Sequence, residues 1–176
     1  MAVKRTLRFD PIDEARRHWE GRWEVGGAMA AATSIMRAGQ IVLAAVDEAL
    51  RPYELTFARY EALVLLDFSR KGSLPLGKMG ERLMIHPTSV TNIVDRLEAQ
   101  GFLRRVPHPT DRRTTLAEIT DAGRAVMTEA TRAVCSVAFA MDGLTADETE
   151  QLVVLLRKLR LSAGDFEERS GDGQGP

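Results

Sequence analysis

Residues 76 to 119 constrain the fold of this chain more than any other stretch, because they read as two short helices followed by a β-hairpin. Leu76, Met79 and Leu83 are three and four residues apart, as the apolar face of a helix requires. A turn follows, and Pro87 stands where the next helix can begin, since its missing N–H costs nothing there. The order of helix, turn, helix and hairpin predicts a winged helix-turn-helix in a mainly α-helical chain.

The second predicted helix, residues 87–100, has two chemically different faces. Its apolar side chains cluster on one side at about 100° per residue, and Gly101 is expected to end the helix. The opposite arc carries hydroxyl, amide and guanidinium groups, which can hydrogen-bond to base edges or phosphates. The residues of this helix that we expect to contact DNA are Pro87, Thr88, Ser89, Thr91, Asn92 and Arg96. An ordinary helix pair with a polar solvent face has the same pattern, so the helices alone do not distinguish a DNA-binding protein from another helical protein.

The predicted hairpin ends in a charged tip, residues 107–113, whose proline-rich first half is typical of a turn. Asp111 and Arg113 are two residues apart and can pair, so that the carboxylate orients the guanidinium. A narrow, A·T-rich minor groove attracts an arginine held in this way. We therefore expect Asp111, Arg112 and Arg113 to contact DNA beside the major groove that receives the second helix.

Positive charge is concentrated in the same part of the chain. Residues 70–113 contain nine Lys and Arg against four acids, whereas the rest of the chain is acidic and the whole carries a net charge of −1. A basic face of this kind attracts phosphates while the remainder stays soluble. Double-stranded DNA is the partner that the sequence predicts. A winged-helix module that binds another protein is the alternative, and it would not need an arginine-bearing wing.

This stretch resembles the multiple-antibiotic-resistance regulator (MarR) family of bacterial transcription factors. The matching residues are the second helix at 90–97, the wing at 111–113 and the start of the following helix at 119–123, and the resemblance spans roughly residues 28 to 162. It implies a dimeric winged helix-turn-helix regulator, here expected to be a repressor, that often releases DNA when a small molecule binds. Met84 departs from the pattern, because such turns often have Gly in a left-handed conformation.

Long helices are predicted on both sides of this region. Asp10-Pro11 starts one that runs to about Trp23, and apolar residues from 29 to 50 indicate another. A third is expected from Thr120 to about Met141, and a capping box of Thr145 and Glu148 begins a last one that runs to about residue 161. Their apolar faces exceed what a small winged domain can cover, so we expect a two-fold homodimer on a pseudo-palindromic operator.

The chain is accordingly divided into four parts. The expected parts are an N-terminal extension with dimerisation helices (1–55), the winged helix-turn-helix region (56–119), C-terminal dimerisation helices (120–163) and a disordered tail (164–176). The charged N-terminal residues do not resemble a secretory signal, and Arg37 and Gln40 interrupt the most apolar stretch. We therefore expect a cytoplasmic protein without a membrane partner, and its single cysteine fits a reducing compartment.

An effector site is implied only by resemblance. Some members of the family that respond to urate or related small acids carry an added N-terminal helix with a tryptophan. Trp19, Glu61 and Arg104 occupy the matching positions and imply a site for a small anionic or aromatic ligand. The acid is usually Asp in those members, and an arginine expected in the recognition helix is Asn92 here. The alternative is that Trp19 and its neighbour Trp23 only staple the added helix to the body of the protein.

Other chemistry finds little support. Residues 72–78, GSLPLGK, match a phosphate-binding loop until Met79 replaces the hydroxyl residue that would bind Mg²⁺, so a linker into the first helix is favoured. The three histidines lie far apart and lack partners at metal-ligand spacing, which excludes an obvious metal site. Cys135 beside an apolar stripe is expected to be a buried, inert thiol. No nucleophile–base motif is present, so we expect no enzyme activity and no cofactor.

Overall fold

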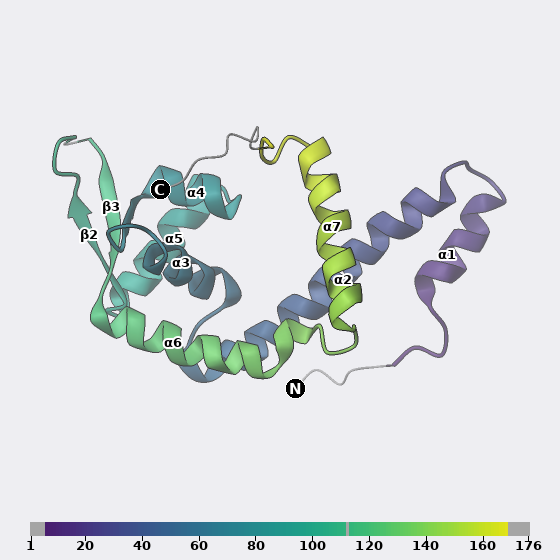
Figure 1. The fold of residues 1–176 in the computed structure, drawn as a ribbon, viewed down its shortest axis with the longest axis horizontal. Helices are drawn as coiled ribbons and strands as arrows, with labels where there is room; N and C mark the ends of the chain where they lie inside the picture. The colour runs from purple at the N-terminus through teal and green to yellow at the C-terminus, as the bar shows by residue number, and fades with distance from the viewer. Residues whose placement is uncertain (1–5, 112, 169–176) are drawn as a thin grey trace. The chain divides into compact units, whose positions relative to one another are not determined.

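The computed structural model describes residues 6–111 and 113–168, and over these the chain is mainly α-helical with a small sheet (Figure 1). The elements in order are α1 (Pro11–Glu20), α2 (Gly26–Leu50), α3 (Phe57–Asp67), β1 (Ser73–Pro75), α4 (Leu76–Leu83), α5 (Pro87–Ala99), β2 (Leu103–Pro107), β3 (Thr115–Ile119), α6 (Asp121–Ser136) and α7 (Ala146–Ser162), with 3₁₀ turns at Arg51–Tyr53 and Ala138–Ala140. The expected winged helix-turn-helix fold is confirmed.

Contacts within the chain separate two units, residues 1–140 and 141–176. The second unit consists of α7 and the residues after it. There Phe166 lies under the guanidinium groups of Arg157 and Arg160, 5.0 and 5.4 Å from their Cζ atoms to the ring centroid. Residues 164–168 therefore fold back on α7, and the rest of the predicted tail lies outside the described residues.

Helix starts follow the capping chemistry that the sequence predicts. The Asp10 carboxylate accepts a hydrogen bond from the Ile12 amide at 2.8 Å, and Pro11 is the first residue of α1. At α7 the capping box is complete, since the Thr145 hydroxyl accepts from the Glu148 amide and the Glu148 carboxylate accepts from the Thr145 amide. Both bonds satisfy amides that a helix leaves without an internal partner.

The core of the first unit lies where α3, α4 and α5 meet the sheet and the ends of α2 and α6. Leu63, Met79 and Leu97 are fully buried there. The sheet is antiparallel in the order β1-β3-β2, and Leu103 of β2 pairs with Ile119 of β3. Residues 73–75, expected to be part of a linker, instead form the edge strand β1, whose Leu74 enters the core.

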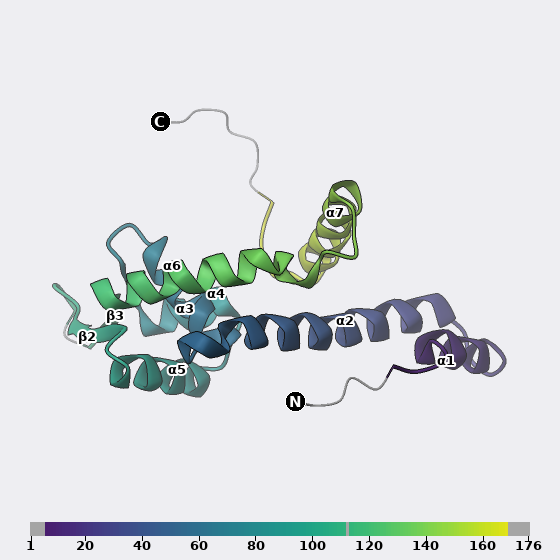
Figure 2. The same ribbon diagram turned by 90° about the horizontal axis from the view of Figure 1, so that it is seen from below.

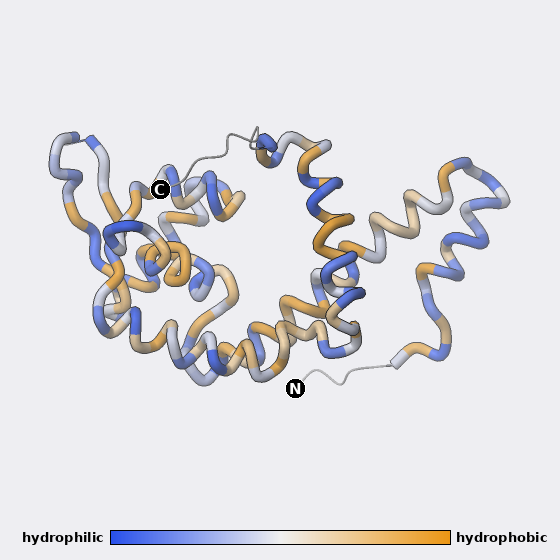
Figure 3. Tube along the Cα trace, viewed as in Figure 1, coloured by the Kyte–Doolittle hydropathy of each residue, from blue (hydrophilic) through white to orange (hydrophobic). Residues whose placement is uncertain are grey.

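Most of α2 lies outside this core. It is the long helix that runs from the winged part to the corner where α1 folds back on it (Figures 1 and 2). Of its 25 residues only Gly26, Val46 and Leu50 are buried, yet apolar residues continue along its length (Figure 3). By length and composition alone the segment Gly26–Tyr53 could cross a membrane, at a mean hydropathy of 1.4. Its C-terminal end packs in the protein core through Val46 and Leu50, whereas the rest of the helix is mostly exposed in this chain.

The end of α6 differs from the prediction. The helix stops at Ser136 instead of reaching about Met141, because Ala138, Phe139 and Ala140 all have positive φ angles, from 46° to 60°. Left-handed residues cannot continue a right-handed helix. Phe139 thus projects from a turn where the predicted apolar stripe would have continued along one helix face.

Candidate nucleic-acid interface

The turn between α4 and α5 uses a left-handed methionine. Met84 has φ 53° and ψ 43°, and its amide donates to the carbonyl of Gly80, which closes α4. Its side chain is 82% exposed, so the role of this residue lies in its backbone conformation and not in core packing. Gly80 lies where the two helices approach closely, since an added Cβ would be 3.2 Å from the Val90 side chain. Met84 therefore adopts the conformation that glycine more often supplies at such a turn.

Helix α5 begins at a histidine cap. The Nδ1 atom of His86 accepts a hydrogen bond from the Thr88 amide at 3.3 Å, which assigns this ring a structural role at the turn. Val90, Val94 and Leu97 are buried against the core, whereas every α5 residue that we expect to contact DNA is exposed. Pro87, Thr88, Thr91, Asn92 and Asp95 line one shallow hollow on this face. The helix thus presents a continuous polar surface to the outside.

The wing is shaped by its own carboxylate. Asp111 accepts hydrogen bonds from the Arg113 backbone amide at 3.0 Å and from the Thr114 hydroxyl at 2.6 Å. These bonds, from the Thr114 hydroxyl first, lower the pKa of Asp111 below its usual value. The predicted pairing of this carboxylate with the Arg113 guanidinium is therefore wrong: its donors are the Thr114 hydroxyl and the amide two residues on, the latter as in an Asx turn.

Arg113 itself is exposed at this tip, free of the core. Arg112 lies outside the described residues. The ring of His108 also supports the turn, since its Nδ1 accepts from the Asp111 amide at 3.2 Å. The tip is thus organised by side chain-to-backbone bonds, which leave the Arg113 side chain to reach outward.

An ion-pair cluster joins the wing to α5, and the sequence did not reveal it. Arg105 of β2 pairs with Asp95, with 2.5 Å between Nη2 and Oδ1, and with Glu98. The Glu98 carboxylate also accepts from the Arg105 amide at 2.9 Å, the main reason that its pKa is lowered. The signal in the sequence is the pair of acids, Asp95 and Glu98, one turn apart on a helix whose other exposed side chains are neutral or basic. The cluster holds the strand that leads to the wing against the helix beside it.

The three residues of the implied effector site lie in different places. The Trp19 indole N–H donates to the Glu24 carbonyl at 2.9 Å, and its ring is 6.2 Å from that of Trp23 at the α1–α2 corner. Glu61 is half-buried on α3, and burial raises its pKa. Arg104 on β2 pairs with Glu118 of β3. Since α1 and β2 lie at opposite ends of the first unit (Figures 1 and 2), one chain does not bring Trp19 to the other two.

The part of the chain that the structure covers has no cluster of His, Cys, Asp or Glu that could hold a metal ion. Cys135 is exposed, so the expectation of a buried thiol is wrong.

A core of three helices, a left-handed turn, an exposed polar helix and a supported basic wing define a winged-helix protein of the DNA-binding class. Residues 55–115 match the MarR family. MhqR, a transcriptional regulator of Bacillus subtilis, is 31% identical over 107 residues, which are 60% of this chain and 74% of MhqR. Another B. subtilis relative, YkoM, is 37% identical over 89 residues, or 50% of this chain, but only 58% of its own length is covered.

Solved structures agree with this match. Sco5413, a MarR family transcriptional regulator from Streptomyces coelicolor, is 54% identical with a TM-score of 0.75, over 81% of this chain and 99% of Sco5413. A variant of Escherichia coli MarR complexed with operator DNA is 25% identical with a TM-score of 0.67, over 73% of this chain and 91% of that one. The chain belongs to the MarR family of transcriptional regulators, and it is not an enzyme.

Proposed function

We propose that this MarR-family regulator is a cytoplasmic homodimer that represses transcription by binding a pseudo-palindromic operator. Helix α5 lies in the major groove and the wing, residues 107–113, in the adjacent minor groove. The observation that carries this proposal is the ion-pair cluster of Arg105, Asp95 and Glu98, which holds the polar helix and the basic wing together as one surface. A protein-interaction module would need neither this connection nor an exposed arginine at the tip.

Dimerisation is supported by apolar side chains that the single chain leaves exposed. In the first unit they are Ile35, Met36, Ile41, Leu43, Val137 and Phe139, and in the second Val153, Val154, Leu155 and Leu159. Burying such surface stabilises an assembly by about 25 cal/mol per Å². Sedimentation velocity at micromolar concentration is expected to show a dimer, with operator half-sites about one helical turn, ~10 bp, apart. A monomer that still binds DNA specifically would contradict this expectation.

The two DNA-contacting elements should make separable contributions. Asn92 lies on the exposed arc of α5, so Asn92→Ala is expected to relax base preference within the half-site. Arg113 lies at the wing, so Arg113→Ala is expected to weaken binding most where the flanks are A·T-rich. Each effect should be about 1–3 kcal/mol. Selection of bound sequences from random duplex DNA measures both variants against the unsubstituted protein, and equal losses on every sequence would refute the division.

Release by a small anionic or aromatic ligand completes the proposal. The support is the half-buried carboxyl of Glu61, whose pKa is raised by burial, together with the family resemblance at Trp19 and Arg104. Such a ligand must bind the DNA-free arrangement more tightly, because only differential affinity shifts an equilibrium. A thermal-shift screen of small organic acids and phenols, repeated with Arg104→Ala, tests whether this side chain holds the ligand.

A further inference from the structure

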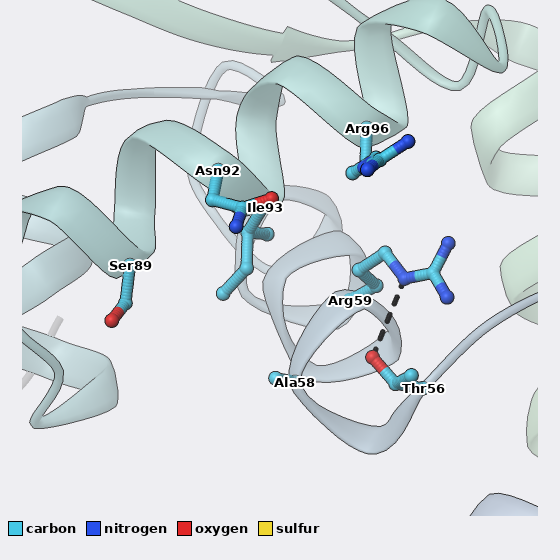
Figure 4. Close-up of a pocket in the computed structure, with 7 residues that line it drawn as sticks. All are labelled: Thr56, Ala58, Arg59, Ser89, Asn92, Ile93 and Arg96. Atoms are coloured by element: carbon cyan, nitrogen blue, oxygen red, sulfur yellow. Dashed lines mark hydrogen bonds between the residues drawn. The ribbon is translucent and has the colours of Figure 1, made fainter.

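A second hollow borders the exposed face of α5, on the side of α3. It is lined by Thr56, Ala58 and Arg59 from the start of α3 and by Ser89, Asn92, Ile93 and Arg96 from α5 (Figure 4). Figure 4 shows the two arginine side chains approaching from the two helices at one end of this hollow, with Asn92 nearer its middle. The sequence alone did not predict that α3 contributes to this face, because Arg59 lies 30 residues before the nearest of the α5 lining residues.

Arg59 is held in place by neutral groups. Its Nε donates to the Thr56 hydroxyl at 3.3 Å and its Nη1 donates to the Gln100 side-chain carbonyl at 3.4 Å. Gln100 is itself tied to the Glu54 carbonyl at 3.2 Å. A guanidinium has five N–H donors, so these bonds orient Arg59 and leave other donors open.

The charge of this hollow is also uncompensated. Within the described residues, neither Arg59 nor Arg96 has a carboxylate within 4.0 Å, whereas Arg104 and Arg105 are both paired. The hollow on the other side of Asn92 contains Asp95 instead. Beyond Arg59, a third hollow is lined by Asp47, Glu48, Arg51 and Glu54 as well as Thr56 and Arg59, so negative charge resumes there. The two arginines of this hollow are therefore flanked by acidic side chains in both neighbouring hollows.

The dimensions of DNA place a phosphate in this zone. A helix with its side chains is about 10–12 Å across and the major groove is about 12 Å wide, so the sugar-phosphate strands run close beside a docked helix. Asn92 borders both hollows and therefore marks the middle of the docked face. One strand then passes the side that carries Arg59 and Arg96.

We propose that Arg59 and Arg96 jointly bind one phosphate of the operator backbone, with the Thr56 and Ser89 hydroxyl groups beside it. The inference rests on the proposed function and extends the DNA interface to α3. The two guanidinium groups supply charge-assisted hydrogen bonds, which position the protein without reading a base. Arg59 thus sets how α5 is seated in the groove.

Salt dependence tests this contact in the full-length dimer on a selected operator. Releasing counterions from one phosphate contributes about 0.9 to the log–log slope, so replacing both Arg59 and Arg96 with Gln, which frees two phosphates per dimer, should make the slope shallower by about 1.8. Because Arg96 stays on the same phosphate, Arg59→Gln alone should make the slope shallower by less than this, with base preference unchanged. Arg59→Lys keeps the charge and should retain most of the slope. Arg132→Gln is the matched control, because it removes the same charge from an exposed position on α6 and should leave the slope unchanged.

A backbone-substituted operator gives an independent measurement. Neutral methylphosphonate is placed at one phosphate after another, and each DNA is titrated with the unsubstituted protein and with Arg59→Gln. We expect one position per half-site at which the unsubstituted protein loses more affinity than Arg59→Gln, because the variant holds that phosphate through Arg96 alone. Equal losses in both proteins at every position, or an unchanged slope for Arg59→Gln, would overturn the assignment of Arg59 while leaving the proposed function intact. Absence of any salt-dependent operator binding by the unsubstituted protein would overturn both.

Discussion

Replacing Gly123 with alanine is expected to lower the free energy of unfolding by about 3 kcal/mol, the upper part of the range for overpacking a core. An added Cβ would lie 2.0 Å from the carbonyl oxygen of Phe102 and 2.9 Å from the Ile119 side chain. The first of these neighbours is backbone and cannot rotate away. It is also bonded to the Thr120 amide at 3.1 Å, so moving it breaks the junction between the wing and α6.

Urea denaturation followed by circular dichroism measures the change, and Gly77→Ala is the control. Gly77 is an exposed residue of α4 with no atom within 4 Å of an added Cβ, so alanine there should stabilise the helix by up to about 1 kcal/mol. The two substitutions are chemically identical and should have opposite signs. If Gly123→Ala were as stable as the unsubstituted protein, the close packing of α6 on Phe102 would be wrong.

Operator affinity is expected to fall about 10³- to 10⁵-fold between 50 and 200 mM salt. In the proposed dimer Arg59 of α3, Arg96 of α5 and Arg113 of the wing lie near phosphates in each chain. A dimer that contacts six to ten phosphates should show a log–log slope of about −5 to −9. The chain as a whole carries a net charge of −1, so a slope of this size must come from the local basic surface. Long-range attraction by the whole protein would not produce it.

Fluorescence anisotropy with a labelled operator gives the affinity at each salt concentration. A duplex of random sequence serves as the control, because nonspecific binding should share much of the slope while being weaker at every concentration. A slope near zero on the selected operator would favour the protein-interaction module instead. Affinity that falls steeply with salt but is equal on the two duplexes would show that the protein binds DNA without sequence preference.

The sequence by itself determined the features that depend on neighbours along the chain. Helix periodicity placed α4 and α5, and side-chain caps placed the starts of α1 and α7, because both arise from groups three or four residues apart. The same local rules located the polar arc that includes Asn92 and the charged hairpin after it. These features are what identify the fold and its family.

Only the tertiary structure decided which charges meet. The sequence pairs Asp111 with Arg113, but the folded tip uses that carboxylate for an amide and a hydroxyl. The sequence also could not show that Arg105 is paired while Arg59 has no carboxylate partner among the described residues, because pairing depends on groups brought from other elements. The early end of α6 is a third case, since residues 138–140 contain no Gly or Pro that would mark a left-handed turn. Periodicity describes one element at a time, whereas pairing, exposure and the seating of α5 depend on how separate elements are packed together.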